Sequence, residues 1–163
     1  SRRSRFSTFS CFSCVLAAMQ IKELGHVVLY VSDLERSAAF YRGTLGFREI
    51  FHEVGAAAFS AGRTHHELLL LEVGTPPRKK GMEPGLYHIG FKIGDSTDEL
   101  KAAYQELKIA GVQIVGTADH GVTHSLYILD PDGNELELYA DVSDAWKKDP
   151  KAAMGGTRSL KLD

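Results

Sequence analysis

A repeat with a spacing of 62 residues is the feature that most restricts the fold of this chain. Adding 62 to His26 gives His88, and adding 62 to Asp33 gives Asp95. Each copy begins with an apolar, β-prone strand and continues with a capped helix that ends at glycine. Three more strands then follow in each half. Internal repetition therefore predicts the order β-α-β-β-β twice.

The two copies are expected to contain the following elements. The first has strands at residues 25–31, 47–54, 56–61 and 66–73, and a helix through Leu34, Ala38, Tyr41 and Leu45. The second has strands at residues 87–93, 112–115, 126–129 and 136–139, and a helix through Leu100, Ala103, Leu107 and Ala110. Ser32 with Glu35 and Ser96 with Glu99 predict capping boxes. We therefore expect paired modules in residues 19–140 (about 21–73 and 86–140), joined by a linker at 74–85 and followed by a tail at 141–163.

The last hairpin, HSLYILDPDGNELELY at residues 124–139, carries the clearest pattern of alternating side chains. The Asp-Pro-Asp-Gly sequence within it is typical of a tight turn. Leu136 and Leu138 then point to one face of the strand and Glu137 to the other. If the apolar faces pack on the helices, His26 and His88 lie on the opposite faces, in a shared cleft. The predicted fold class is α+β, with two βαβββ modules that form a cupped mixed sheet around a metal site.

Composition restricts the class of protein. Of the 163 residues, 44% are hydrophobic and 25% are charged, as in ordinary soluble domains. No apolar run approaches the roughly 20 residues that span a bilayer, so we expect no membrane partner. The formal net charge of −2, with no evident basic face, argues against nucleic acid as a partner. We expect a cytoplasmic protein.

Residues 1–18 differ from the rest of the chain. They contain Arg2, Arg3, Arg5 and both cysteines, but no acidic residue and no helical or alternating pattern. The favoured interpretation is a disordered, dispensable extension ahead of a native start at Met19. The alternative is a transit peptide, which would place the protein in an organelle.

Two histidines and one carboxylate on the cleft faces suit a divalent metal ion. The residues are His26, His88 and Glu137. A set of two His and one carboxylate with open coordination positions favours non-haem Fe(II), with Mn, Zn and Ni as alternatives. No organic cofactor is expected.

The stretches GHVVLYVSDLERSAAFYRGTLGF, LYHIGFKI and LYILDPDGNELELY resemble the vicinal oxygen chelate superfamily. This superfamily includes glyoxalase I, the bleomycin and fosfomycin resistance proteins and the extradiol catechol dioxygenases. The resemblance covers about residues 21–142. It implies paired βαβββ modules forming a cup around a divalent metal. It also implies His26, His88 and the Glu after Gly-Asn-x-x, which is Glu137, as the ligands.

Two further matches resemble the extradiol dioxygenases, most closely a one-domain type. His66 stands in a His-His-x-Leu sequence, and Tyr127 lies ten residues before Glu137. The resemblance implies ring cleavage of a catechol-type aromatic diol with Fe(II) and O₂, an activity typical of aromatic catabolism. His66 would exchange a proton with the substrate, and Tyr127 would donate a hydrogen bond to a substrate oxygen. His120 is a candidate for a further hydrogen-bonding group.

Two other functions stay open. A glyoxalase-type lyase or isomerase resembles this pattern but uses a fourth protein ligand, for which Glu72 is the candidate. A metal-free protein that binds or sequesters a small molecule is the other alternative. The habit of this fold to pair sheet edges predicts a homodimer.

Overall fold

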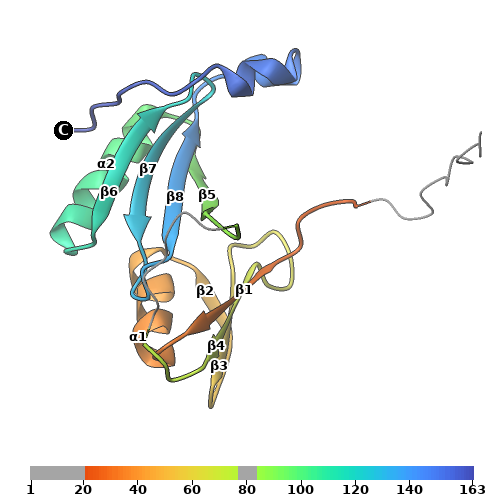
Figure 1. Cartoon of the computed structure of the whole chain (residues 1–163), viewed down its shortest axis with the longest axis vertical. Coiled ribbons are helices and arrows are strands. Elements are labelled where there is room, and N and C mark those ends of the chain that lie inside the picture. The colour runs from red at the N-terminus through yellow and green to blue at the C-terminus, as the bar shows by residue number, and fades with distance from the viewer. Residues whose placement is uncertain (1–20, 77–83) are drawn as a thin grey trace, which may run out of the picture.

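The computed structural model describes residues 21–76 and 84–163, which form two four-stranded sheets (Figure 1). The two sheets follow one another along the long axis of the molecule, and the helices α1 and α2 lie on the same side of it. The predictions about residues 1–18 fall outside the described residues and stay predictions. Within the described ranges, no helix has the length and apolar character needed to cross a membrane.

The first sheet has the strand order β1-β4-β3-β2. Its strands are β1 (Val27–Val31), β2 (Arg48–Glu53), β3 (Ala56–Ser60) and β4 (Leu68–Glu72). β1 and β4 are parallel, whereas the other neighbours are antiparallel. The helix α1 (Leu34–Ala39) follows β1 and continues into the π-helical turn η1 (Phe40–Thr44).

The second sheet repeats this order as β5-β8-β7-β6. Its elements are β5 (His88–Gly94), α2 (Thr97–Ile109), β6 (Ile114–Asp119), β7 (Thr123–Leu129) and β8 (Glu135–Asp141). β5 and β8 are again the parallel pair. Two 3₁₀ turns, η2 (Ala145–Lys147) and η3 (Pro150–Met154), follow β8. The same connectivity in both halves is the βαβββ order that the repeat predicts.

The two helices begin differently from each other. Ser96 caps α2 as predicted, since its side chain accepts from the N–H of Glu99, and the Glu99 carboxylate accepts from the N–H of Asp95. The capping box predicted for α1 is wrong. Asp33 is the cap there, because its carboxylate accepts from the N–H of Arg36. Ser32 instead contacts Asp132 in the second half.

Several strand boundaries also differ from the predicted ones; β6 extends to Asp119 and β7 begins at Thr123, for example. β4 begins at Leu68, so His66 lies in the loop before the strand rather than on it. β6 begins at Ile114, because the N–H of Val112 still bonds to the carbonyl of Leu107 at the end of α2. Gly111 has a φ of +71°, the left-handed conformation that often ends a helix.

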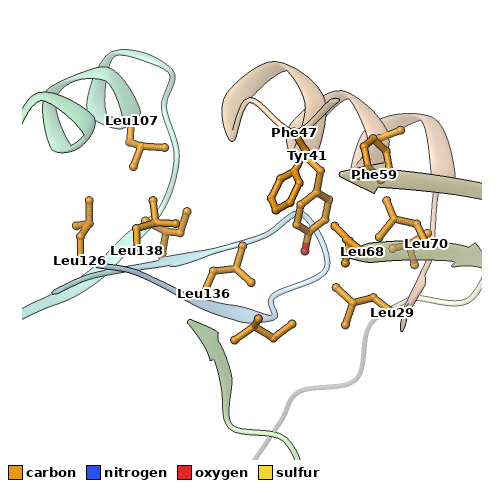
Figure 2. Close-up of a cluster of buried hydrophobic side chains, with 14 of the residues drawn as sticks. Leu29, Tyr41, Phe47, Phe59, Leu68, Leu70, Leu107, Leu126, Leu136 and Leu138 are labelled. Carbon is orange, nitrogen blue, oxygen red and sulfur yellow. The ribbon is translucent and has the colours of Figure 1, made fainter. Parts of the chain in front are cut away.

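One hydrophobic core joins the halves, and it lies on the helix side of both sheets (Figure 2). Tyr41 and Phe59 are fully buried in its first half, and Leu136 is fully buried in its second half. Phe47 packs edge-on against Phe91 across the two halves, with ring centroids 5.3 Å apart. Because the strand alternation buries these positions, the residues between them lie on the opposite, open faces.

The turn between β7 and β8 binds the second half to α1 and η1. The Tyr41 hydroxyl donates to Oδ2 of the buried Asp130 over 2.8 Å. Asp132 accepts from the N–H of Ser32 at 3.1 Å and from Nη2 of Arg36 at 2.9 Å. Burial, and then the charge of Asp130, raise the pKa of Tyr41 well above its usual range, so the phenol stays a donor. These contacts fix the end of the hairpin that carries Glu137.

Candidate metal and substrate site

The parallel pair β5 and β8 brings His88 to Glu137. In the register of these strands His88 lies opposite Glu135, and Gly90 lies opposite Glu137. Alternation turns Leu136 into the core and leaves both glutamates on the open face. The diagonal contact is the closer one, because Nε2 of His88 lies 3.2 Å from Oε2 of Glu137.

Hydroxyl groups from β7 surround the other oxygen of Glu137. Ser125 donates to Oε1 over 2.6 Å, and the Tyr127 hydroxyl donates to it over 3.2 Å. His120 contacts the same hydroxyl, with 2.8 Å between its Nε2 and the Tyr127 oxygen. Burial, and then the negative charge of Glu137, raise the pKa of Tyr127 to about 12. The phenol is therefore protonated at neutral pH and acts as a donor.

A second cluster contains His26, His65 and His66. His26 directly precedes β1, and His66 lies two residues before β4. Because β1 and β4 are parallel and Val27 pairs with Leu68, both histidines lie at the same end of the pair. The ring centroids of His26 and His66 are 4.5 Å apart, and so are those of His65 and His66. Burial, and then the positive charge of the other two imidazoles, lower the pKa of His66. Its imidazole is thus neutral at pH 7 and able to take a proton.

Glu67 shapes the loop that carries these histidines. Its carboxylate accepts from the backbone N–H groups of Ala61, Arg63 and Thr64 at 2.8–2.9 Å. Burial alone would raise the pKa of Glu67, but these hydrogen bonds and one from Ser60 outweigh it and lower the pKa. Glu67 is not among the site residues predicted from the sequence. The signal available was a short polar loop whose N–H groups need an acceptor.

Glu72 has a different place from the one expected of a fourth metal ligand. It shares the helix-facing side of β4 with the buried Leu68 and Leu70. Its Oε1 accepts from the N–H of Leu34 over 3.0 Å, in the first turn of α1. In this structure the carboxylate completes the helix terminus, and its role as a fourth metal ligand stays a prediction.

The His88–Glu137 pair fits two coordination positions of a metal ion. Two ligands at right angles, each about 2.1 Å from an ion, are about 3 Å apart. The observed separation of Nε2 and Oε2 is 3.2 Å. Nδ1 of His88 is buried and has no hydrogen-bond partner in the part of the chain that the structure describes, and Oε1 of Glu135 lies 3.7 Å away from it. Buried polar atoms without a partner are rare and require an explanation.

The third expected ligand lies elsewhere in the chain. His26 belongs to the cluster with His65 and His66. Across residues 21–76 and 84–163, no three His, Cys, Asp or Glu side chains come close enough together to hold one ion. One chain therefore brings together His88, Glu137, Tyr127 and His120, and separately His26 and His66.

A cavity of about 360 Å³ adjoins Glu137. Its wall includes Tyr139 of β8 and Trp146 of η2. Another cavity, of about 480 Å³, lies between η1 and α2 and is lined by none of the predicted site residues. The smaller cavity is therefore the candidate substrate site.

The sequence matches the model of the Glyoxalase/Bleomycin resistance protein/Dioxygenase superfamily over residues 23–138. It is 33% identical over 121 residues to biphenyl-2,3-diol 1,2-dioxygenase 2 of Rhodococcus globerulus, covering 73% of this chain and 63% of that protein. It is 35% identical over 131 residues to catechol-2,3-dioxygenase of Bacillus subtilis (strain 168), covering 77% and 44%. The chain thus spans less than two thirds of either dioxygenase.

The chain is also similar to proteins that are not named as catechol-type dioxygenases. Metallothiol transferase FosB of Lysinibacillus sphaericus (strain C3-41) is 29% identical over 137 residues, covering 80% of this chain and 94% of that protein. Among solved structures, a glyoxalase/dioxygenase from Nostoc punctiforme superposes with a TM-score of 0.65 at 19% identity, covering 88% of this chain and 100% of that chain. This likeness confirms the two-module α+β fold.

Proposed function

Because the chain belongs to the Glyoxalase/Bleomycin resistance protein/Dioxygenase superfamily, we propose that it is a metal-dependent extradiol dioxygenase acting on a catechol-type aromatic diol. The observation that carries the proposal is the contact of Tyr127 with both Glu137 and His120, beside His88. A protonated phenol next to metal-ligand side chains suits the binding of a diol oxygen. The similarity to two proteins named as catechol-type dioxygenases supports the same activity.

His26, His88 and Glu137 are the residues that would hold the ion, and Fe(II) suits two His and one carboxylate. The bound ion would supply positions for the diol oxygens and for O₂. Two of these three donors, His88 and Glu137, lie side by side within one chain.

The side chains near the proposed metal site differ in what they do to the substrate and to the ligands. Tyr127 donates its phenolic hydrogen to a substrate oxygen, because its raised pKa keeps it protonated. His120 orients the phenol through Nε2. His66, neutral because its pKa is lowered, takes a proton from a diol hydroxyl and later returns it. Ser125 holds Oε1 of Glu137, which leaves Oε2 facing His88.

The proposal requires a second copy of the chain, because His26 and His66 lie apart from the His88–Glu137 pair. β1 and β5 are both edge strands, so each has a free edge for another chain. Among residues 21–76 and 84–163, nothing covers the apolar open face of the first sheet, where Val28 is 43% exposed and Tyr30 is 71% exposed. A symmetric dimer that covers this face would bring the histidine cluster of one chain to the His88–Glu137 pair of the other.

The activity is tested by loading the protein anaerobically with Fe(II), adding a catechol and O₂, and following the coloured ring-cleavage product. His66→Phe should lose about 10²-fold or more of turnover while Fe stays bound, because it removes the proton acceptor. His65→Phe is the matched control, next to it in the same cluster, and should keep most turnover. Equal losses in the two variants would contradict the role of His66. Absence of ring cleavage by the Fe(II)-loaded wild type would contradict the proposed function.

The assembly is tested by mixing two variants that each lack a metal ligand. His26→Ala and Glu137→Gln should each bind little metal alone. If the site is shared, a mixed dimer has one intact site, so random exchange of chains should restore about a quarter of the wild-type metal content. A site built within one chain would give no recovery after mixing.

A second candidate function is a metal-dependent thiol transferase. The observation that favours it is the similarity to metallothiol transferase FosB of Lysinibacillus sphaericus, which is 29% identical over 137 residues. Incubating metal-loaded protein with fosfomycin and an added small-molecule thiol tests it: consumption of that thiol with formation of its adduct, together with unchanged catechol, would support this function instead.

A further inference from the structure

The C-terminal segment, residues 142–163, is fastened to the second sheet at both of its ends. The N–H groups of Val142 and Ser143 donate to the carbonyl of Val122 at 2.9 and 3.2 Å. Arg158 and Asp119 exchange two backbone hydrogen bonds at 2.8 and 3.0 Å, and Leu162 is buried in the core. Figure 1 shows the segment crossing the end of this sheet, with η2 and η3 between the two attachments.

The cavity beside Glu137 is lined by β8 and by this segment. The residues that line it are Val122, Thr123, Glu137, Tyr139, Asp141, Trp146 and Ala153. Glu137, Tyr139 and Asp141 follow one another along the open face of β8, and four residues of strand span about 13 Å. The cavity volume of about 360 Å³ is within the range of small-molecule sites.

Apart from Glu137, the wall of the cavity combines apolar side chains with one ion pair. Its other acidic side chain, Asp141, is paired, with Oδ2 lying 2.8 Å from Nζ of Lys92. Beside this ion pair stand the apolar side chains of Val122, Trp146 and Ala153. An uncharged group, and above all an aromatic ring, is the ligand chemistry that such a wall accepts.

We propose that this cavity binds the ring substituent of the aromatic substrate, and that Trp146 selects for it. The inference rests on the proposed function, which places the reacting diol oxygens beside Glu137 at the other end. A substituent that extends along β8 then reaches the indole of Trp146. The enzyme is thereby specific for aryl-substituted diols over catechol itself.

The test compares catechol with a phenyl-substituted catechol by calorimetric titration of the metal-loaded protein under anaerobic conditions. Trp146→Ala should weaken phenylcatechol binding by about tenfold and change catechol binding by less than about twofold, because only the substituent reaches the indole. Trp146→Phe, which keeps a ring, should retain most of the preference. Met154→Ala is the matched control, since Met154 lies in the same segment, is 83% exposed and does not line the cavity.

Wild-type fluorescence gives a second readout that needs no variant. Trp146 is the one tryptophan of the chain, so phenylcatechol should change its emission and catechol should not. If both diols bind but Trp146→Ala weakens them equally, or if the emission responds equally to both, the selecting role of Trp146 is overturned while the proposed function stands. If neither diol binds to the wild type, the proposed function and this inference fail together.

Discussion

Nε2 of His88 lies 3.2 Å from Oε2 of Glu137, across two neighbouring parallel strands. The contact is a diagonal one, because the register places His88 opposite Glu135. Ser125 holds the other oxygen of Glu137 at 2.6 Å. The strand register and the Ser125 hydroxyl therefore orient the Glu137 carboxylate toward the imidazole of His88.

The first prediction concerns metal content. Glu137→Gln should reduce the metal bound per chain sharply, because it removes the anionic donor that faces His88. Glu135→Gln is the control on the same face of β8, and it should leave metal content nearly unchanged. Elemental analysis of both purified variants decides between them, and equal metal in the two would show that the ligand is misassigned.

The second prediction concerns Thr157, whose hydroxyl lies 3.2 Å from Nδ1 of His120. We expect Thr157 to be a positioning residue that holds this imidazole against Tyr127. Thr157→Val keeps the shape but removes the hydroxyl, so kcat for a catechol should fall about fivefold with KM unchanged, as loss of roughly 1 kcal/mol implies. Thr157→Ser should restore kcat. Failure of serine to rescue would show that Thr157 acts through packing alone.

The sequence predicted the features that depend on local pattern. The repeat that relates His26 to His88 gave the two modules, and alternation in β8 separated Glu137 from Leu136 and Leu138. Ser96 was recognisable as a cap because its partner, Glu99, lies three residues away.

The features that the sequence did not predict depend on contacts between distant residues. Ser32 looked like a helix cap, but its partner is Asp132, one hundred residues away. Ser125 reaches Glu137 only through the register of β7 and β8. Alternation places His26 and His88 on open faces, but it does not fix how the two sheets lie relative to each other. Because the arrangement of the sheets is not encoded in this alternation, the pattern alone predicts His26 and His88 in one shared cleft.

The third prediction tests the contact that joins the halves. Tyr41→Phe removes the donor to Asp130, which keeps hydrogen bonds from the N–H and the amide of Asn134. Because no buried acceptor is left empty, the loss of unfolding free energy should be moderate, about 1–2 kcal/mol. Urea denaturation measures it. Tyr104→Phe, in the half-buried face of α2, should cost less, and an equal cost would show that the Asp130 contact contributes little.

The last prediction uses pH to test Glu67, which holds the loop before His65 and His66. The pKa of Glu67 is lowered in the folded chain from its usual value of 4.5, because backbone N–H groups stabilise the charged carboxylate. A lowered folded pKa means that the stabilisation is present above the unfolded pKa and is lost as pH falls through the folded one. Glu67→Gln should therefore reduce the free energy of unfolding by about 1–2 kcal/mol at pH 7. The difference from the wild type should shrink steadily below pH 4.5.

Glu53→Gln, on the exposed side of β2, is the control and should give a small difference at every pH. Urea denaturation of the three proteins between pH 3.5 and 7 measures this, and a Glu67→Gln deficit that stays constant with pH would mean that the carboxylate charge does not hold the loop.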